Sequence, residues 1–550
     1  MSLFKNLMRN KKTRMKTPSK MEEELDHTTI SSSLKEMEEL LKQLLGNNDG
    51  LVIKHFKIFG QFQAVIFYFS NLINQDVINK DIIKPLMYIP EHLQNKTIYL
   101  SNLIEVILSE TLYHSQAKVD KNTENLIEFL LRGETLIFIE GSKEAIHIDT
   151  RSIEKRAITQ PETEQVILGP REGYIESITT NIALLRYRLP TADFQVKTMK
   201  IGRLTKSTVA YCYLKGIASE KVVKEVEKRL SEIDIDVILD AGYLEQFIED
   251  NPFSPFPQVQ STERPDKTVA NLAEGRVAIL VDGSPFALMV PVVFNQFYQT
   301  AEDYSSRFLM GSFVRIARIL ALVFSLVFPS LYVSLISFNP ELLPTEFAVA
   351  VAGGRAGVPY PAVIEVLIIE VAMEVLREAT VRLPKQVGGA LSIVGVLVIG
   401  QAAVEAGLSS PITVVVIALT TIGSFATPAY SAAFALRMLR FPIMILAGIF
   451  GLYGIVIGVI FIFNHMLSLK SFGVPYMSPV SPENYPGMKD VVIRSPLWWM
   501  PKRPAFLHSN NRNRLGNDSK TILEHNKVGN DQREVSNNGG SKGNNDSSGS

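Results

Sequence analysis

Charged residues are distributed very unevenly along the 550 residues of this chain, and this pattern constrains the fold more than any other feature. Asp, Glu, Lys and Arg are dense before about residue 276 and sparse from 319 to 469. A predominantly apolar run of about 20 residues is long enough to cross a bilayer as a helix. The sequence therefore predicts an α+β soluble N-terminal half, of mixed α/β character with two subdomains, followed by a polytopic α-helical membrane domain.

The same pattern predicts where the parts begin and end. The first twenty residues hold seven Lys or Arg and no acid, so this stretch is either a solvated tail or a contact for anionic lipid. The last residues are rich in Asn, Ser and Gly. We expect a basic disordered N-terminus at 1–30, soluble subdomains at 31–150 and 151–308, a transmembrane domain with four to six helices at 309–470, and a tail at 471–550 that is disordered after about 505.

Two segments of the soluble half resemble each other. Residues 134–150 and 276–293 both contain an apolar run, an acid-Gly-Ser turn and a second apolar run, which indicates two equivalent β-hairpins. Helical spacing of apolar residues predicts helices at 31–46 and 122–132, the second with Asn122 as its N-cap. Between 251 and 274 we expect a connector in which Thr262 caps a turn and Pro265 fixes the backbone.

The chemistry of the side chains argues against an enzyme. The sequence contains no P-loop, no GxGxxG after a strand, no HExxH and no GxSxG. The eight His are scattered, and the single Cys212, in a strand-like run, excludes an intramolecular disulfide. The balanced net charge gives no information about nucleic acid binding. We expect no enzymatic activity, no cofactor or metal, and no nucleic acid partner.

Candidate membrane helices follow the soluble half at 319–338, 361–383, 387–408, 411–434 and 441–464. Arg307, Arg315 and Arg318 precede the first, which places the soluble half in the cytoplasm by the positive-inside rule. If all five segments cross, the C-terminus ends outside, but the basic residues beyond 470 argue against that. The segment 361–383 carries Glu365, Glu370 and Glu374, which would be costly in lipid. It therefore lies at the interface, faces a water-filled vestibule, or packs inside the bundle, and we favour partial burial.

The segment 387–408 has an unusual composition for a lipid-facing helix. Small residues gather on one side, which allows close helix packing. Val394, Leu397, Gln401 and Glu405 share the opposite stripe, and an amide and a carboxylate there should face protein or water. This helix is a candidate pore-lining helix; the alternative is a packed membrane helix whose Glu405 reaches the interface.

Several strings along the chain resemble one family, in order from about residue 130 to 480. They are SPFPQVQSTERPDK (254–267), EGRVAILVDGSPFALMVPVVF (274–294), EDYSSRF (302–308), LREATVRLP (376–384), VIGQAAVEAGL (398–408), RFPIMILAGIFGLYGI (440–455) and SFGVPYMSP (471–479). Together they resemble the A subunit of the bacterial spore germinant receptors, the GerA family. EDYSSRF departs from the more usual EDYY form. The family motifs, with an expected structural or signalling role, contain Thr262, Glu263, Arg264, Pro265, Asp266, Asp282, Glu302 and Asp303.

The resemblance implies a multi-pass protein of the spore inner membrane with its soluble half in the cytoplasm. It also implies two partners, a permease-like B subunit that senses the nutrient and a lipoprotein C subunit. The resemblance implies that A subunits form a homo-oligomeric ring, expected to be a pentamer, around a nutrient-gated channel for monovalent cations. In such a ring Leu397 would form an apolar gate and Glu405 would favour cations. The alternative function is a non-conducting membrane scaffold for the permease-like sensor.

Overall fold

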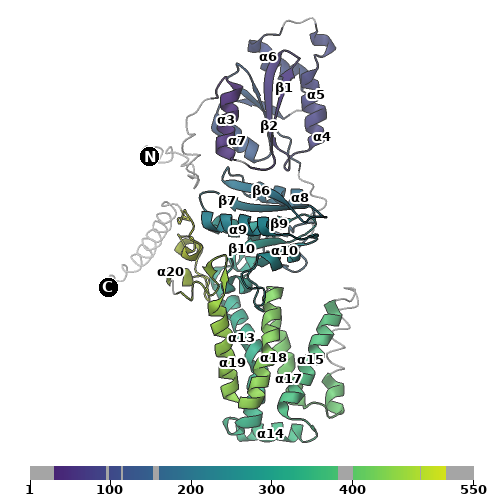
Figure 1. Ribbon diagram of the computed structural model, residues 1–550, viewed down its shortest axis with the longest axis vertical. Coiled ribbons are helices and arrows are strands. Elements are labelled where there is room, and N and C mark those ends of the chain that lie inside the picture. Colours follow the sequence, from purple (N-terminus) through teal and green to yellow (C-terminus); the bar gives the residue numbers. More distant parts are fainter. Residues whose placement is uncertain are drawn as a thin grey trace, which may run out of the picture.

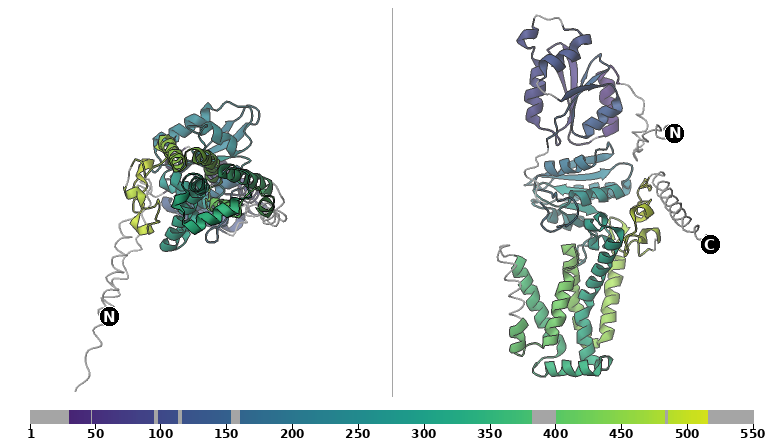
Figure 2. Two further views of the ribbon diagram at one scale, coloured as in Figure 1. Left: turned by 90° about the horizontal axis from the view of Figure 1, so that it is seen from below. Right: turned by 180° about the vertical axis from the view of Figure 1, so that it is seen from behind.

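The computed structural model describes residues 30–46, 48–94, 98–112, 116–152, 160–381, 400–482 and 485–515. Two β-sheet units are stacked along the long axis of the molecule, and a bundle of long helices continues below them (Figure 1). The view from behind shows the same order of parts (Figure 2). The predicted fold class, an α+β N-terminal half followed by a helical half, is therefore confirmed.

The first unit is a five-stranded antiparallel sheet in the order β1-β2-β4-β5-β3. Its strands are β1 (Leu51–Ile58), β2 (Phe62–Phe69), β3 (Ala117–Asp120), β4 (Thr135–Ile139) and β5 (Ala145–Ile148). Its helices are α3 (Leu34–Leu45), α4 (Gln75–Val77), α5 (Lys84–Met87), α6 (Leu100–Val106) and α7 (Thr123–Leu131). The α3 and α7 helices confirm the two predicted from apolar spacing, and the Asn122 side chain caps α7 by accepting from the Glu124 amide.

The second unit repeats this plan, with strand order β6-β7-β9-β10-β8. Its strands are β6 (Phe194–Ile201), β7 (Ser207–Leu214), β8 (Gln260–Thr262), β9 (Val277–Val281) and β10 (Ala287–Val290). Residues of α8 (Ile178–Arg188) and α11 (Pro265–Glu274) pack on one face, and those of α9 (Glu220–Glu232) and α10 (Ala241–Ile248) on the other. The two predicted hairpins are β4–β5 and β9–β10, and they occupy equivalent places in the two sheets.

A polar joint connects the two units. The Asn48 amide donates to the Phe194 carbonyl over 2.8 Å, and Arg186 donates to Asn48 and to the Asp49 carbonyl. The Asp49 carboxylate accepts from both the amide and the hydroxyl of Thr198, each at 2.7 Å. Burial lowers the pKa of Arg186 to about 10. These bonds hold residues 48 and 49 of the first unit to the strand edge of the second.

The helical half contains α13 (Phe308–Phe338), which follows the short α12 (Ala301–Ser305) and descends from the second sheet (Figure 1). The next elements are α14 (Thr345–Arg355), which lies across the far end, and then α15 (Ala362–Val381), α17 (Pro411–Ser424), α18 (Tyr430–Phe450) and α19 (Leu452–Ser468). By length and composition, α13 and α18 are sufficient to cross a membrane, while α17 and α19 are shorter apolar helices.

Two of the predicted membrane segments have wrong boundaries. The segment 411–434 joins α17 to the start of α18, and 441–464 joins the end of α18 to most of α19. The break falls at Gly451, whose φ of 62° lies in the left-handed region that favours glycine. At Gly454 a Cβ would lie 2.0 Å from the Leu446 carbonyl oxygen, so the turn is too tight for a side chain. A continuous apolar run therefore contains a hairpin of two helices.

The second sheet and the bundle share one hydrophobic core. Phe256, Val292 and Phe297 of the sheet unit cluster with Leu322 of α13 and Leu436 of α18. The chain then returns to the sheet unit through the short hairpin of β11 (Lys470–Ser471) and β12 (Val474–Pro475), and through the C-terminal segment 485–515, which begins with α20 (Tyr485–Met488). In the C-terminal segment the Asn510 amide donates to the Ile217 carbonyl, and Arg503 donates to the Ala273 carbonyl.

Candidate functional site

The motif Thr262–Asp266 binds the loop 160–172 to the second sheet. The Glu263 carboxylate accepts from the amides of Glu162 and Thr163 and from the Thr163 hydroxyl. Arg264, 2% exposed, donates to the Glu164 and Pro170 carbonyls and to the Asp266 carboxylate. Every charged group of the motif therefore has a partner within the fold.

The start of α11 explains the order of residues in this motif. Arg264 is the N-cap residue and Pro265 occupies the first helical turn, where its missing N–H is tolerated. The predicted cap by Thr262 takes a different form, since Thr262 ends β8 and its hydroxyl accepts from the Arg264 amide. Thr262 also donates to Glu164. Although burial disfavours the charged form of Glu164, Lys267 and Thr262 keep the pKa of this carboxyl below its usual value.

The other predicted motif residues lie in two different places. Asp282 begins the β9–β10 turn, where its carboxylate accepts from the Ile178 amide at the start of α8. Glu302 and Asp303 belong to α12 at the top of the bundle. Glu302 is half-buried, whereas Asp303 is buried and caps α12 by accepting from the Thr300 amide and hydroxyl. The structure therefore does not bring these motif residues into one site.

Asp303 is the centre of a buried ion cluster at the junction between the sheet unit and the bundle. We define this junction cluster as Asp303, Arg315, Arg318 and Asp490. Arg315, fully buried, lies 3.3 Å from Asp303 and 2.7 Å from Asp490, and Arg318 lies 3.1 Å from Asp303. Tyr304 donates to the Asp490 carboxylate. Burial raises the pKa of Asp490 above its ordinary value, although Arg315 opposes this shift.

The junction cluster links three segments that are far apart in the sequence. Asp303 comes from α12, the arginines from the first turns of α13, and Asp490 from the C-terminal segment. Sequence reasoning found Asp303, Arg315 and Arg318 but missed Asp490. No local signal marks Asp490, because its partner Arg315 is 175 positions away. Two carboxylates facing two guanidinium groups make the cluster neutral, so it stabilises the junction without offering a free charge.

The three carboxylates of α15 are paired with arginines inside the bundle. Glu365 accepts from Arg355 at 3.0 Å, from the Ser410 amide at 2.7 Å and from the Ser409 hydroxyl. Both oxygens of Glu370 lie 2.9 Å from Arg440 of α18. The predicted partial burial of α15 is confirmed. The ion pairs offset much of the cost of placing these carboxylates in an apolar bundle.

The third carboxylate, Glu374, lies nearer the sheet-proximal end of α15. It lies 2.6 Å from Arg377, as the helical spacing predicted, and 3.4 Å from Arg437 of α18. Arg377 also donates to the Ser424 hydroxyl of α17. The second predicted intrahelical pair, Glu378 with Arg382, includes a residue outside the described part of the chain.

The predicted pore residues are only partly described. Val394 and Leu397 lie outside the described residues. Gln401 and Glu405 are exposed on the helical stretch 400–406 near the far end of the bundle, where the Gln401 amide donates to the Glu405 carboxylate over 2.9 Å. The neighbouring Ala403 is buried in the core with Val416. Ala402 and Ala406, from the predicted small-residue side, are exposed together with Gln401 and Glu405, so this stretch does not show the predicted separation into a packed small-residue side and a polar side.

Metal and thiol chemistry find no support in the described residues. Across the described ranges, no group of three or more His, Cys, Asp or Glu side chains comes together in a way that could hold a metal ion. Cys212 is buried in β7, as predicted, and burial raises the pKa of its thiol to about 12. Its thiol is therefore protonated and shielded at neutral pH.

The chain thus combines two sheet units of the same strand order with a helical bundle that contains buried ion pairs. This arrangement defines a multi-domain protein whose helical half is a candidate membrane domain. The family model of the Bacillus/Clostridium GerA spore germination protein matches residues 39–506, and this chain belongs to that family. Spore germination protein KA of Bacillus subtilis (strain 168) is 44% identical over 89% of this chain and 90% of its own length. Spore germination protein GerLA of Bacillus cereus is 38% identical over 87% of this chain and 96% of its own length.

A solved structure is also similar to part of this chain. The N-terminal domain of the A subunit of the Bacillus megaterium spore germinant receptor GerK3 covers 48% of this chain and 98% of its own length. It has 35% sequence identity and a TM-score of 0.39.

Proposed function

We propose that this chain is the A subunit of a nutrient-sensing spore germinant receptor and forms an oligomeric, nutrient-gated cation channel in the spore inner membrane. Family membership supports the receptor role. The observation that carries the channel role is the exposed Gln401–Glu405 pair. Glu365, Glu370 and Glu374 each have an arginine partner, whereas Glu405 is exposed and receives its hydrogen bond from an amide. A ring of such carboxylates would attract monovalent cations.

In this proposal the sheet units lie in the cytoplasm, together with the C-terminal segment. The contacts of Asp490, Arg503 and Asn510 with the sheet-proximal half support a common side for both. A chain that leaves and returns to one side crosses the membrane an even number of times. Of the four to six crossings expected from the sequence, this proposal therefore favours an even number. Exposed Lys470 and Lys489, beyond α19, agree with the positive-inside rule.

The proposed partners are the permease-like B subunit, which senses the nutrient, and the lipoprotein C subunit. A nutrient can open the channel only by binding more tightly to the open state than to the closed one. The junction cluster supports a route for such coupling, because it ties α12 and the C-terminal segment, which contacts the sheet unit, to the start of α13. A change in the sheet unit would thereby reach α13 through α12 and the C-terminal segment.

Reconstitution of the full-length protein in liposomes tests this function. Ring-shaped oligomers and flux of potassium or sodium would support a channel. Monomers that bind the B subunit but pass no cations, at a protein density that gives flux with a known channel, would support the non-conducting scaffold instead. Glu405→Lys provides the matched variant, since it reverses charge at an exposed position and leaves the buried ion pairs intact.

A further inference from the structure

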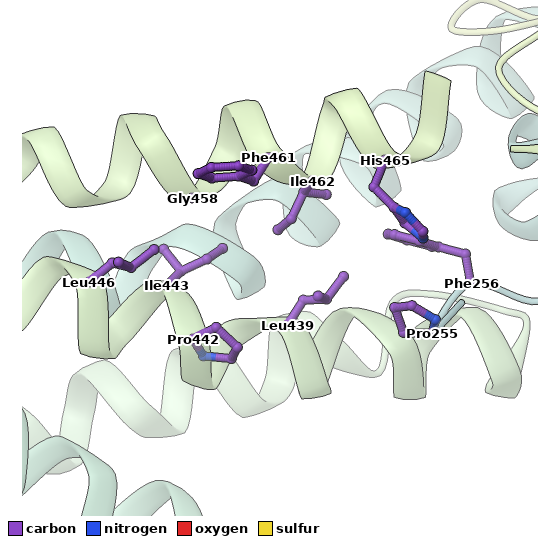
Figure 3. Close-up of a pocket in the computed structure, with 10 residues that line it drawn as sticks. All are labelled: Pro255, Phe256, Leu439, Pro442, Ile443, Leu446, Gly458, Phe461, Ile462 and His465. Carbon is purple, nitrogen blue, oxygen red and sulfur yellow. The ribbon is translucent and has the colours of Figure 1, made fainter. Parts of the chain in front are cut away.

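An apolar groove runs between α18 and α19 on the outside of the bundle. Its volume is about 280 Å³. Leu439 and Ile443 of α18 form one wall and Phe461 and Ile462 of α19 the other, with His465 at one end (Figure 3). A cavity of about 150 Å³ can hold benzene, so this groove has room for a longer apolar group.

Gly458 brings α19 close to α18 along one part of the groove. Gly458 of α19 faces α18, and a Cβ at this position would lie 3.3 Å from Ile443 and 3.4 Å from Leu446. A larger residue at 458 would therefore project into the space between the helices. The opposite edge is formed by Pro442, which is exposed and has a compact ring.

The groove opens onto the apolar outer surface. Phe461, at its edge, is 67% exposed, and Ile445, Val456 and Ile460 are exposed nearby on the same two helices. In the membrane location that we propose, this surface lies at the depth of the lipid tails. An apolar groove continuous with a lipid-facing surface is accessible to an acyl chain from the bilayer.

The end of the groove nearest the sheet unit has a different character. Ser254 and His465 form a hydrogen bond of 2.9 Å, and Phe253 is 96% exposed in the loop that forms this end. Lys470 follows α19 and is exposed. Aromatic side chains and basic residues at this level are typical of the interface between lipid tails and headgroups. The groove itself is almost entirely apolar, and polar groups follow at this end, as the headgroup follows the acyl chains of a phospholipid.

We infer that the α18–α19 groove binds one acyl chain of a membrane phospholipid, with the headgroup at the His465 end. The inference rests on the proposed membrane location. Its consequence is a contact between lipid and the sheet unit, because Phe256 lines the groove and also belongs to the aromatic cluster with Phe294 and Tyr476, with ring centroids 6.1 to 6.4 Å apart. The bound chain would support the loop through which the sheet unit rests on the bundle.

The test uses full-length protein in vesicles of phosphatidylethanolamine and phosphatidylglycerol that contain a phosphatidylglycerol with a photoreactive acyl chain. After irradiation, mass spectrometry identifies the labelled peptides. We expect stronger labelling at 439–446 and 458–465 than at other exposed apolar positions, such as Leu320 and Val323 of α13. Equal labelling of all lipid-facing helices would overturn the inference, as would a protein segment cross-linked in the groove in place of lipid.

Gly458→Leu fills the groove and should reduce its labelling about fivefold or more, because an overfilled site excludes the chain. Gly353→Leu is the matched control, since Gly353 of α14 has open space around its Cβ position and should leave labelling unchanged. Ile462→Trp fills the groove from the other wall and serves if Gly458→Leu does not fold. Unchanged labelling in a folded groove-filling variant would overturn the inference. Cation flux in the same vesicles tests the channel separately, so the two proposals fail independently.

Discussion

Glu370 of α15 and Arg440 of α18 form a buried ion pair in which one guanidinium nitrogen lies 2.9 Å from both carboxylate oxygens. The two side chains are 4% and 3% exposed. Burying two charges costs several kcal/mol, which a good pair largely offsets, but a single remaining charge has no such compensation. The pair therefore fixes α15 against α18 and makes each partner dependent on the other.

Arg440→Met should destabilise the protein by about 3–5 kcal/mol, because it leaves Glu370 buried without a partner. The double variant Glu370→Leu with Arg440→Met should recover most of that loss, since it removes both charges together. Thermal melting of the purified protein in detergent measures both effects. If the double variant melts no higher than the single one, the ion pair is not the reason for the loss.

Asp490→Asn should loosen the C-terminal segment from the bundle. It removes one of the two carboxylates of Arg315, and lost hydrogen bonds to charged groups cost about 1.5–3 kcal/mol. We expect faster tryptic cleavage after Arg494 and Lys502. Lys489→Gln, at the exposed neighbouring position, should cleave at these two sites as the wild type does. Equal protection in Asp490→Asn would mean that the other contacts hold the segment alone.

Glu405→Lys should lower cation flux severalfold in liposomes, because it replaces an attractive carboxylate with a repulsive ammonium. Glu405→Gln, which removes the charge and keeps the shape, should have an intermediate effect. This graded order separates electrostatics from packing. Identical flux in all three proteins would remove Glu405 from the ion path.

Leu397→Ala should make spores leak ions or germinate without nutrient. The prediction follows from the sequence, since Leu397 lies outside the described residues. A smaller apolar side chain widens a hydrophobic gate and favours its wetting. The measurement is potassium retention in dormant spores. Retention equal to that of wild-type spores would count against a gate at this position.

Glu245 should make stability depend on pH. Partial burial, together with Glu249 and Asp240, raises its pKa to about 7. The folded state therefore holds a proton that the unfolded chain releases at about pH 4.3, so stability falls as pH rises from about 4.5 to 7. Because Glu245 is only half-buried, we expect a loss of about 1–2 kcal/mol.

Glu245→Gln should remove this pH dependence and melt higher than the wild type at pH 8. Glu232→Gln, at an exposed position of α9, is the control and should keep the wild-type slope. Melting temperatures measured between pH 5 and 8 test the prediction. A wild-type slope in Glu245→Gln would assign the pH dependence to another group.

Local patterns predicted the elements that local chemistry determines. The hairpins at 134–150 and 276–293 could be predicted because strand-forming runs flank a turn glycine, and Gly141 and Gly283 both have positive φ. The cap of α7 by Asn122 is likewise a contact between near neighbours. The shared strand order of the two sheets extends this similarity beyond the hairpins. The proposed domain boundaries remain predictions.

Contacts between distant segments could not be predicted in the same way. Arg315 appeared in the sequence as a charge beside a membrane helix, but its partner Asp490 is brought to it only by the return of the chain through the C-terminal segment. Hydropathy also failed to separate α18 from α19, because Gly451 interrupts the helix without interrupting the apolar run. Gly458, another glycine of the same run, stays helical and allows close contact with Ile443 of α18 instead. The roles of these glycines depend on packing partners.

The first sheet unit is joined to the rest of the molecule near Asn48, Asp49 and Arg186, and it lies at the end farthest from the bundle (Figure 1). In mechanical terms it is a lever arm with its pivot at this polar joint. A small rotation at the pivot sweeps the far end of the unit through a much larger arc. A partner that binds the far end would therefore exert torque on the second sheet across this joint.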